Sequence, residues 1–600
     1  MGRCRYPLRV GVVMAISTDA VGREDEFVRI LRVDDAWELV EELSGLVRES
    51  GTDGEYEAVG RITSRLERWG VPHAVHEPEL WISLPRRASL TVGHRTFPSK
   101  TPSMAASTPP GGLTAPATYL PAGFADSVND IFAASHVEGE VAGRIVVTEG
   151  MPMPGKVGDL EARGALGVVC IAPGARIHEG ICTTIWGSPD LTTWGREPRI
   201  PVVSVSNPDG RELIDVLGGG ATATIVAEHE TRWRPIPVVT AEIRGAVEPE
   251  RFVLLHGHLD SWHVGVGDNA TGDATLLEVA RALHERRADL ARSIRICWWS
   301  GHSHGRYAGS TWYADAFAND LARNCVCHIN CDSPGCRDAT VFSDVYWMAE
   351  AERFAKLAVA DFAGLESQGR SPIRAGDLSF NNLGVSTFFM LSSTMPDALR
   401  QERGLYAVGG CGGNVEWHTE ADTLDVADRE HLLRDIRVYG GAAFRAANLP
   451  VHPLDFRATI GQIEDVLRRL QPRVSGLVDL EPSFGHLAAA RRALEELQAA
   501  AERGAPDVNR ARPLNDALLR TGRALVPVLY AREGRYRQDP ALDIPLLPDF
   551  AAAEAAIGSV PDGVVRTELL RARNRLEGAL LEVRDAVAAA GCAALAERRP

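Results

Sequence analysis

Between residues 237 and 391, short apolar segments typical of buried strands alternate with amphipathic segments typical of helices. The strand-like segments are PVVTAEIRG, RFVLLHGHLD, IRICWWSG, CVCHINCD and VSTFFML, and the helical segments include GDATLLEVARALHERR and AERFAKLAVADFA. Strands that are apolar along their whole length and separated by helices predict an α/β fold, with a mostly parallel sheet covered by helices on both faces. In such folds, ligands bind beyond the carboxyl ends of the strands.

The remaining segments predict further domains, because single cores stop growing near roughly 250–300 residues and this chain has 600. Residues 35–70 have helical spacing, and residues 97–125 are rich in Pro, Gly, Ser and Thr, which predicts a connecting loop. Residues 136–230 contain short glycine-punctuated strands, and residues 455–600 are rich in Ala, Leu, Arg and Glu. We therefore expect a split catalytic domain, an insert and a helical domain. Their expected bounds are 30–125 with 235–452, then 126–234, and then 453–600.

The overall charge argues against a nucleic-acid partner. The chain carries 64 basic and 80 acidic residues, a net charge of −16, whereas phosphate binding requires a basic face. No apolar run reaches the roughly 18 residues that a membrane helix needs, so we expect no membrane partner. The short run VGVVMAIS after Arg3, Arg5 and Arg9 loosely resembles a signal peptide but has no clean cleavage site. We expect a cytoplasmic protein, with secretion as the alternative and Met14 as a second candidate start.

Four of the ten cysteines lie close together in NCVCHINCDSPGC. Their spacing, C-x-C-x3-C-x4-C, differs from that of zinc fingers and zinc ribbons. The alternation of cysteine with apolar residues instead predicts a buried strand, in which the thiols pack as small apolar groups. Ten cysteines in a chain of this length are also too few for a disulfide-stapled scaffold.

Imidazoles and carboxylates follow the predicted strands at several places. His258 and Asp260 end one strand, Asp268 lies in the glycine-rich turn GVGDNATG, and Asp332 ends the strand HINCD. Two further sequence segments supply histidines, namely His302 and His304 in WWSGHSHGRYAGS and His418 in EWHTEADTLD. Mixed nitrogen and oxygen ligands from separate loops are typical of catalytic zinc sites, in which one carboxylate can bridge two ions.

At these residues the sequence resembles the co-catalytic zinc metallopeptidases, which include bacterial leucyl aminopeptidases, glutamate carboxypeptidase II and the non-catalytic transferrin receptor. The matching pieces are GHLDSW, GDNATG followed by LLEVARAL, WWSGHSHGRYAGSTWYA, NCDSPG and EWHTEADTLD. Residues 136–230 resemble the inserted protease-associated domain of these relatives. The segment PLNDALLRTGRALVPVLYAREGRYRQDP resembles their dimerisation-type helical domain, which implies a homodimer.

The resemblance implies a role for each matching residue. His258 would bind a first metal with Asp260 behind it, Asp268 would bridge two metals, His418 would complete the first and Asp332 would bind the second. The implied cofactor is zinc, as one or two ions, with another divalent transition metal as the alternative.

The sequence departs from the family where two adjacent glutamates, a general base and a ligand, are expected. Alignment on Gly309 puts Ser303 and His304 there, whereas alignment on Trp299 puts His302 and Ser303 there. We expect His304 as a ligand and His302 as the base, with Glu416 as a second candidate base.

Three functions follow from these residues. The first is a metal-dependent hydrolase that acts on a peptide or amide bond of a small substrate through metal-bound hydroxide. The second is a metalloenzyme with non-peptidase chemistry, such as a lyase, an isomerase or a specialised amide-cleaving enzyme. The third, a non-catalytic binding protein, ranks last because His258, Asp268, Asp332 and His418 are all retained.

Overall fold

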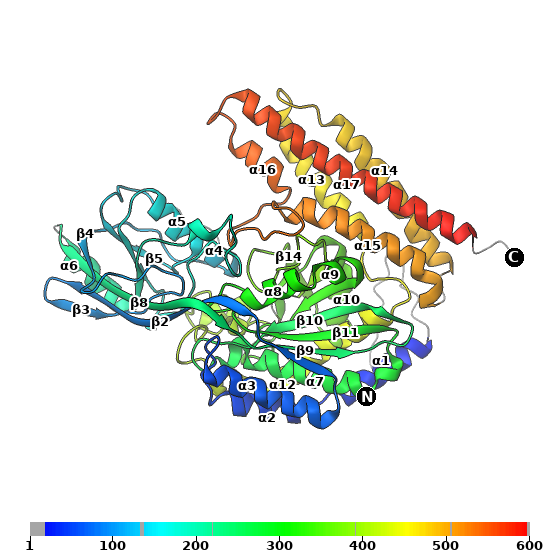
Figure 1. The fold of residues 1–600 in the computed structure, drawn as a ribbon, viewed down its shortest axis with the longest axis horizontal. Helices are drawn as coiled ribbons and strands as arrows, with labels where there is room; N and C mark the ends of the chain where they lie inside the picture. Colours follow the sequence, from blue (N-terminus) through cyan, green and yellow to red (C-terminus); the bar gives the residue numbers. More distant parts are fainter. Residues whose placement is uncertain (1–17, 133–136, 219, 390–391, 505–506, 597–600) are drawn as a thin grey trace.

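The computed structural model describes residues 18–132, 137–218, 220–389, 392–504 and 507–596. The signal-peptide-like run and Met14 lie outside these residues. The described chain forms a central α/β body, a second sheet beside it and a helical region that packs against it (Figure 1). The mixed α/β fold and the C-terminal helices agree with the sequence-based expectation. No described helix is long and apolar enough to cross a membrane.

The central sheet has six strands in the order β1-β9-β11-β10-β12-β15. The four strands from β11 to β15 run parallel, whereas β9 pairs antiparallel with both β1 and β11. In spatial order, the bounds of the strands are His73–His76, Val238–Ile243, Arg292–Trp299, Glu248–His258, Cys325–Asn330 and Thr387–Phe388. The carboxyl ends of the three strands β10, β11 and β12 therefore lie at one edge of the sheet.

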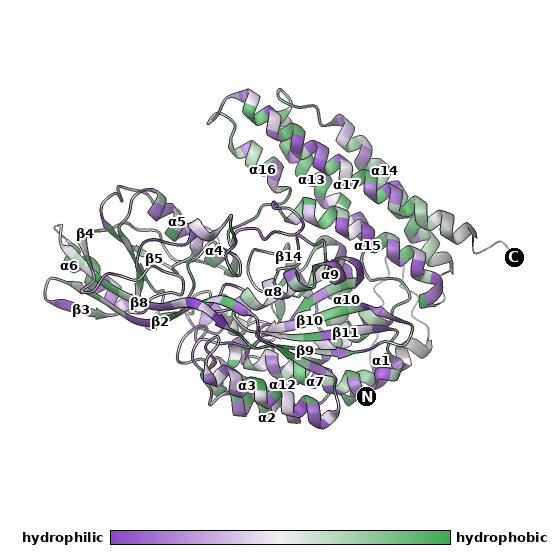
Figure 2. Ribbon diagram, viewed as in Figure 1, coloured by the Kyte–Doolittle hydropathy of each residue, from purple (hydrophilic) through white to green (hydrophobic). Residues whose placement is uncertain are grey.

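Helices cover both faces of this sheet, which explains why its central strands are largely apolar (Figures 1 and 2). In β10, Phe252 and Leu254 pack with Tyr313 and Leu321 of α8 and α9, while Val253 and Leu255 point to the opposite core. The helices of the body are α1 (Thr18–Ile30), α2 (Asp34–Leu43), α3 (Asp53–Trp69), α7 (Thr271–Glu285), α8 (Ala308–Ala316), α9 (Ala318–Asn324), α10 (Glu352–Ala363), α11 (Asp397–Glu402) and α12 (Arg429–Asn448). A small parallel pair, β13 (Phe342–Tyr346) and β14 (Ser367–Arg370), completes the body.

The second sheet has seven strands in the order β3-β2-β8-β4-β5-β6-β7. The long strands β2 (Glu79–Val92) and β8 (Thr222–Pro235) pair antiparallel and run from the central body into the insert (Figure 1). The other elements are β3 (Arg95–Pro98), β4 (Leu113–Tyr119), α4 (Val128–Phe132), β5 (Ile145–Glu149), α5 (Pro154–Ala162), β6 (Gly167–Ile171), β7 (Val202–Val205) and α6 (Asn207–Leu217).

The insert therefore starts near residue 79, and the boundary expected at residue 126 falls inside its sheet. Residues 97–125, expected to be a connecting loop, contain β4, which pairs with β8 and β5. The sequence pattern does not predict β4, because LTAPATY is short, contains a proline and is flanked by turn-forming residues.

The C-terminal region consists of helices α13 (Phe456–Val474), α14 (Glu481–Gly504), α15 (Val508–Tyr530), α16 (Pro548–Ala555) and α17 (Asp562–Ala596). Their apolar residues continue one of the cores of the central body, for example Leu525 and Leu529 of α15 and Leu576 and Leu580 of α17. Packing of these apolar residues, rather than a solvated tail, accounts for their helical spacing.

The clustered cysteines are buried and free, as the strand interpretation predicts. Cys325 packs on one face of β12, Cys327 and Cys331 belong to the opposite core, and Cys336 lies in a third cluster with Cys411. The chain therefore uses them as small apolar side chains.

A buried histidine of β12 predicts a loss of stability in acid. His328 is fully buried, and burial lowers the pKa of its imidazole to about 3 from the ordinary 6.5. Below pH 6.5 the unfolded chain binds a proton at this histidine and the folded chain does not, so the free energy of unfolding decreases as the pH is lowered. Between pH 6.5 and pH 5 we expect this histidine to cost about 2 kcal/mol of unfolding free energy.

The measurement is urea unfolding at both pH values for the wild type and for His328→Leu. The variant should lose less stability on acidification, whereas His94→Asn, which changes an exposed residue of the β2–β3 turn, should match the wild type. Equal pH slopes for wild type and His328→Leu would contradict the assignment.

Candidate metal centre

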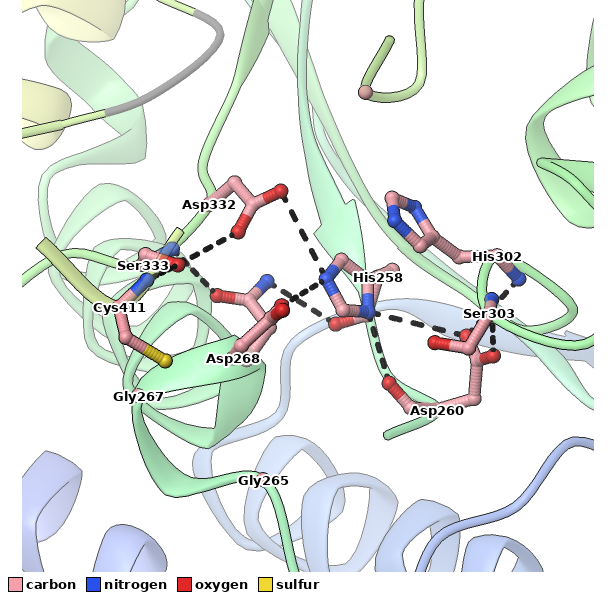
Figure 3. Close-up of polar contacts among 12 residues, drawn as sticks. His258, Asp260, Gly265, Gly267, Asp268, His302, Ser303, Asp332, Ser333 and Cys411 are labelled. Atoms are coloured by element: carbon pink, nitrogen blue, oxygen red, sulfur yellow. Dashed lines mark hydrogen bonds and ion pairs between the residues drawn. The ribbon is translucent and has the colours of Figure 1, made fainter. Parts of the chain in front are cut away.

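His258, at the carboxyl end of β10, has one ring nitrogen fixed by the backbone and the other facing two carboxylates (Figure 3). Its Nδ1 lies 2.8 Å from the carbonyl oxygen of Asp260. Its Nε2 lies 2.9 Å from Oδ1 of Asp268 and 3.8 Å from Oδ2 of Asp332. Asp332 follows β12 and Asp268 precedes α7, so neighbouring parallel strands bring the three side chains together.

His418 meets the other oxygen of Asp268. Its Nε2 lies 3.1 Å from Oδ2, and its Nδ1 lies 3.0 Å from the carbonyl oxygen of Glu179 in the insert. The amide of Glu179 in turn donates to the carbonyl of His418 over 2.8 Å. The insert thus orients a side chain of the site. Sequence reasoning missed Glu179 because its contribution is a backbone carbonyl, which no residue type reveals.

These contacts fix the protonation pattern of both imidazoles. A carbonyl oxygen can only accept, so Nδ1 is the donor in His258 and in His418. In a neutral ring, Nε2 is then also an acceptor, and it faces a carboxylate oxygen of Asp268, which is an acceptor too. A cation between the two atoms would satisfy both. The carboxylates of Asp268 and Asp332 raise the pKa of His258 well above its usual value against the effect of burial. This donor set, with each ligating ring held through its second nitrogen, suits a zinc ion.

The turn that carries Asp268 is fixed by hydrogen bonds from its backbone to a buried carboxylate. The buried Asp422 accepts from the backbone amides of Gly267 and Asp268 over 2.7 and 3.0 Å. Burial raises the pKa of Asp422 to about 7. Asp268 itself has a pKa well below its ordinary value, because the contacts with His258 and His418 outweigh its burial.

Asp260 supports the site rather than facing it. Its carboxylate accepts from the amides of His302 and Ser303 over 3.1 and 2.8 Å and from the Ser50 hydroxyl over 2.7 Å. Burial favours its neutral form, but the nearby imidazoles of His304, His258 and His302 hold its pKa below the ordinary value. It therefore ties the loop after β11 to the end of β10.

The structure places His302, and not His304, beside His258 and Asp332. One ligand atom each of His258, His302 and Asp332 lie within 4.8 Å of one another. His304, which we expected as a ligand, is fully buried elsewhere, with its Nδ1 3.0 Å from the Ser50 hydroxyl. The cause is the backbone, because the His304 carbonyl accepts from the amide of Ser83 in β2. The alignment on Trp299 thus describes the loop better than the alignment on Gly309.

His302 is itself oriented by a carboxylate. Its Nδ1 lies 2.9 Å from Oδ2 of Asp377, whose other oxygen accepts from the Ser310 hydroxyl over 2.7 Å. The rings of His302 and His258 stack with centroids 3.8 Å apart and planes 17° apart. Asp377 lies in the loop GDLSFNNLGV, and its residue type alone does not assign it a role.

The other expected residues have different surroundings. Glu416, the second candidate base, is directed to Arg337 over 3.4 Å and does not line the cavity beside the metal-facing groups. Of the stretch GGCGGNVEW, Gly409 and Trp417 line that cavity, whereas Cys411 is buried 3.3 Å from Asp422. The expected grouping of ligands also changes, because Asp332 lies with His258 while His418 faces the other side of Asp268.

A second acidic group, Glu179, His263 and Glu420, lies close by. The ammonium of Lys100 lies 3.0 Å from Glu179 and also pairs with Glu420, so a cation already balances these carboxylates. We interpret this group as an ionic contact that holds the insert, through Lys100 and Glu179, against the loop of His418.

Comparisons with known proteins find similar sequences and folds. Residues 238–438 match the family model described as Peptidase family M28. A probable glutamate carboxypeptidase, VP8 of Zea mays, is 24% identical over 504 residues, which cover 71% of this chain and 68% of that protein.

Two solved structures share the fold. An aminopeptidase from Aneurinibacillus sp. strain AM-1 aligns with a TM-score of 0.52 and 19% identity, covering 71% of this chain and 96% of that one. The zinc aminopeptidase BSAP from Bacillus subtilis aligns with a TM-score of 0.51 and 20% identity, covering 69% of this chain and 95% of that one.

Fold and comparisons together show an α/β domain similar to those of the metallopeptidases. Its residues 238–438 match the model of peptidase family M28, which agrees with the resemblance to co-catalytic zinc peptidases.

Proposed function

We propose that this chain hydrolyses a peptide or amide bond with a zinc ion held by His258, Asp268 and Asp332. The observation that carries the proposal is the pair of backbone carbonyls that fix Nδ1 of His258 and His418 and turn both Nε2 atoms toward Asp268. Three protein ligands that leave a position open for substrate or water are typical of catalytic zinc. When bound there, zinc would act as a Lewis acid that polarises a carbonyl and makes water a better nucleophile.

His302 is the proton acceptor in this proposal. Its lone pair lies in its ring plane, and that plane is nearly parallel to the ring plane of His258 and displaced from it. The two rings therefore direct their nitrogens along separate planes, and the proposal gives the ligand role to His258 and the base role to His302. Asp377 holds Nδ1 and leaves Nε2 to take a proton from the attacking water. Water adds to the carbonyl carbon, the C–N bond breaks, and the proton passes to the leaving amine.

A second metal position beside Asp268 and His418 is incomplete among the described residues. Ser303 lines the same cavity where relatives carry a glutamate ligand, and His304 is turned away. We therefore propose one firmly bound zinc ion per chain and weak binding of any second ion.

We also propose roles for the other domains. The insert would act as a protease-associated-type domain that walls the site through Met151, Met153 and Glu179. The helices of residues 453–600 would carry a homodimer contact.

The absence of the glutamate pair supports a second candidate function, which is non-peptidase chemistry. A histidine base in place of glutamate is compatible with non-peptidase chemistry on the same scaffold, such as a lyase, an isomerase or specialised amide cleavage. Full zinc occupancy without cleavage of any aminoacyl, dipeptide or N-acyl-amino-acid substrate would favour that alternative.

The test combines metal analysis with kinetics. Purified protein dialysed against zinc should retain about one ion per chain and cleave at least one substrate of that set. His302→Ala should keep the ion and lose about 10²- to 10⁴-fold in kcat, because it removes a general base and no ligand. Loss of the ion in His302→Ala would make His302 a ligand. A protein that binds no zinc and ignores chelators would refute the hydrolase proposal.

A further inference from the structure

Arg306 carries a buried guanidinium without an anionic partner. It lines a cavity of about 70 Å³ together with Asp268, His302 and His418, and only 5% of the residue is exposed. Within the described part of the chain, its side chain makes no hydrogen bond or ion pair. Its guanidinium carbon lies 5.1 Å from the centroid of the Tyr307 ring.

Other buried arginines of the body have hydrogen-bond or ion-pair partners, although Nε of Arg374 has none. Arg48 donates to backbone carbonyls, Arg292 pairs with Glu248 over 2.8 Å, and Arg374 donates to the carbonyls of Leu378 and Asp539. An unpaired buried charge costs several kcal/mol, so such a group is retained where something else satisfies it. Because Arg306 faces the cavity of the proposed metal site, that partner is a ligand of the cavity.

We propose that Arg306 binds a carboxylate of the substrate, so that the site acts on amides bearing a free carboxylate near the scissile bond. This inference rests on the proposed hydrolase function. The planar fork of guanidinium donors matches a carboxylate in bidentate fashion, which gives orientation as well as affinity. The carboxylate would fix the amide against His302, four residues earlier in the same loop.

The backbone holds Arg306 at this position. Its carbonyl accepts from the amide of Gly187 in the insert over 2.7 Å. The hydroxyl of the neighbouring Tyr307 accepts from the backbone amide of Gly376, in the loop that lines the cavity, over 3.0 Å. The ring of Tyr307 also packs on Trp186 of the insert, with centroids 4.2 Å apart. A rigid support of this kind suits a residue that selects among substrates.

An adjoining cavity offers room for the rest of such a substrate. It encloses about 260 Å³ between the insert and the catalytic domain and shares three lining residues with the metal-side cavity. The shared residues are Met151, Met153 and Trp417, and apolar residues beyond them include Phe124, Ile131 and Val408. We therefore choose probes that combine an apolar side chain with a carboxylate.

The experiment compares N-acetyl-phenylalanine with its C-terminal N-methylamide, which lacks the charge. Binding to the zinc-loaded protein is measured by calorimetry, and acetate release gives the turnover. The free acid should bind about 10- to 100-fold more tightly, the effect of a bidentate charged contact. Arg306→Met should abolish that preference while keeping its zinc, and Arg337→Met, a change at a half-exposed arginine near Glu416, should keep it.

Equal binding of acid and N-methylamide, a preference that survives Arg306→Met, or no binding of either probe would each overturn the carboxylate site. Turnover of both probes at equal rates would also overturn the carboxylate site, but it would support the hydrolase proposal. Arg306-dependent binding of the acid without turnover of any amide would instead refute the hydrolase proposal and support the carboxylate site.

Discussion

Replacing Asp268 by asparagine should remove the zinc ion and nearly all activity. Asp268 is the one side chain that faces both imidazoles, 2.9 Å from His258 and 3.1 Å from His418. Asparagine keeps the shape but removes the charge, and a neutral amide is a poor ligand for zinc. Since the ion supplies several kcal/mol of transition-state stabilisation, we expect kcat/KM to fall by more than about 10⁴-fold.

The measurement pairs metal analysis with kcat/KM on the substrate found to be cleaved. Asp425→Asn is the matched control, because Asp425 is exposed in the segment that follows His418. It should bind zinc and turn over like the wild type. A zinc-loaded Asp268→Asn that retains activity would show that the ion is held elsewhere, and the proposed centre would be wrong.

The expectations that succeeded rest on periodicity and on strand ends. Strands apolar on both faces predict a sheet covered twice, and Phe252 and Val253 of β10 do point into opposite cores. Because parallel strands end at one edge, His258 after β10 and Asp332 after β12 are brought together without any knowledge of the loops.

The expectations that failed depend on backbone paths that residue types do not encode. His302 and His304 are two positions apart in a loop, and a single backbone contact, from the Ser83 amide to the His304 carbonyl, decides which ring enters the site. The insert boundary was misplaced because β4 is short and interrupted by Pro116. Glu179 acts through its carbonyl, and such a role leaves no trace in the sequence.

Arg48 is a further residue that no motif reveals, and its loss should have a large effect. It lies between α2 and α3, fully buried, and donates to the carbonyls of Leu259, Val264 and Gly265 over 2.9, 2.7 and 3.0 Å. These carbonyls belong to the loop that joins His258 to Asp268. One guanidinium thus fixes the path of the chain between two metal-facing residues.

Arg48→Met should destabilise the protein by about 3–5 kcal/mol or more, because each buried carbonyl left without a donor costs about 1–3 kcal/mol. The change also removes the charge that lowers the pKa of Asp273, a buried carboxyl whose pKa burial already raises to about 8. Arg48→Lys should recover only part of the loss, because one ammonium cannot reproduce the fork of donors.

Urea unfolding and zinc titration of the folded protein separate the two consequences. Arg48→Met should lower both the unfolding free energy and the zinc affinity, whereas Arg68→Met, at an exposed position of α3, should change neither. If Arg48→Met is destabilised but binds zinc as tightly as the wild type, Arg48 holds the core without ordering the loop. Reduced affinity would instead mean that the metal site is preorganised by a residue more than 200 positions away in the sequence.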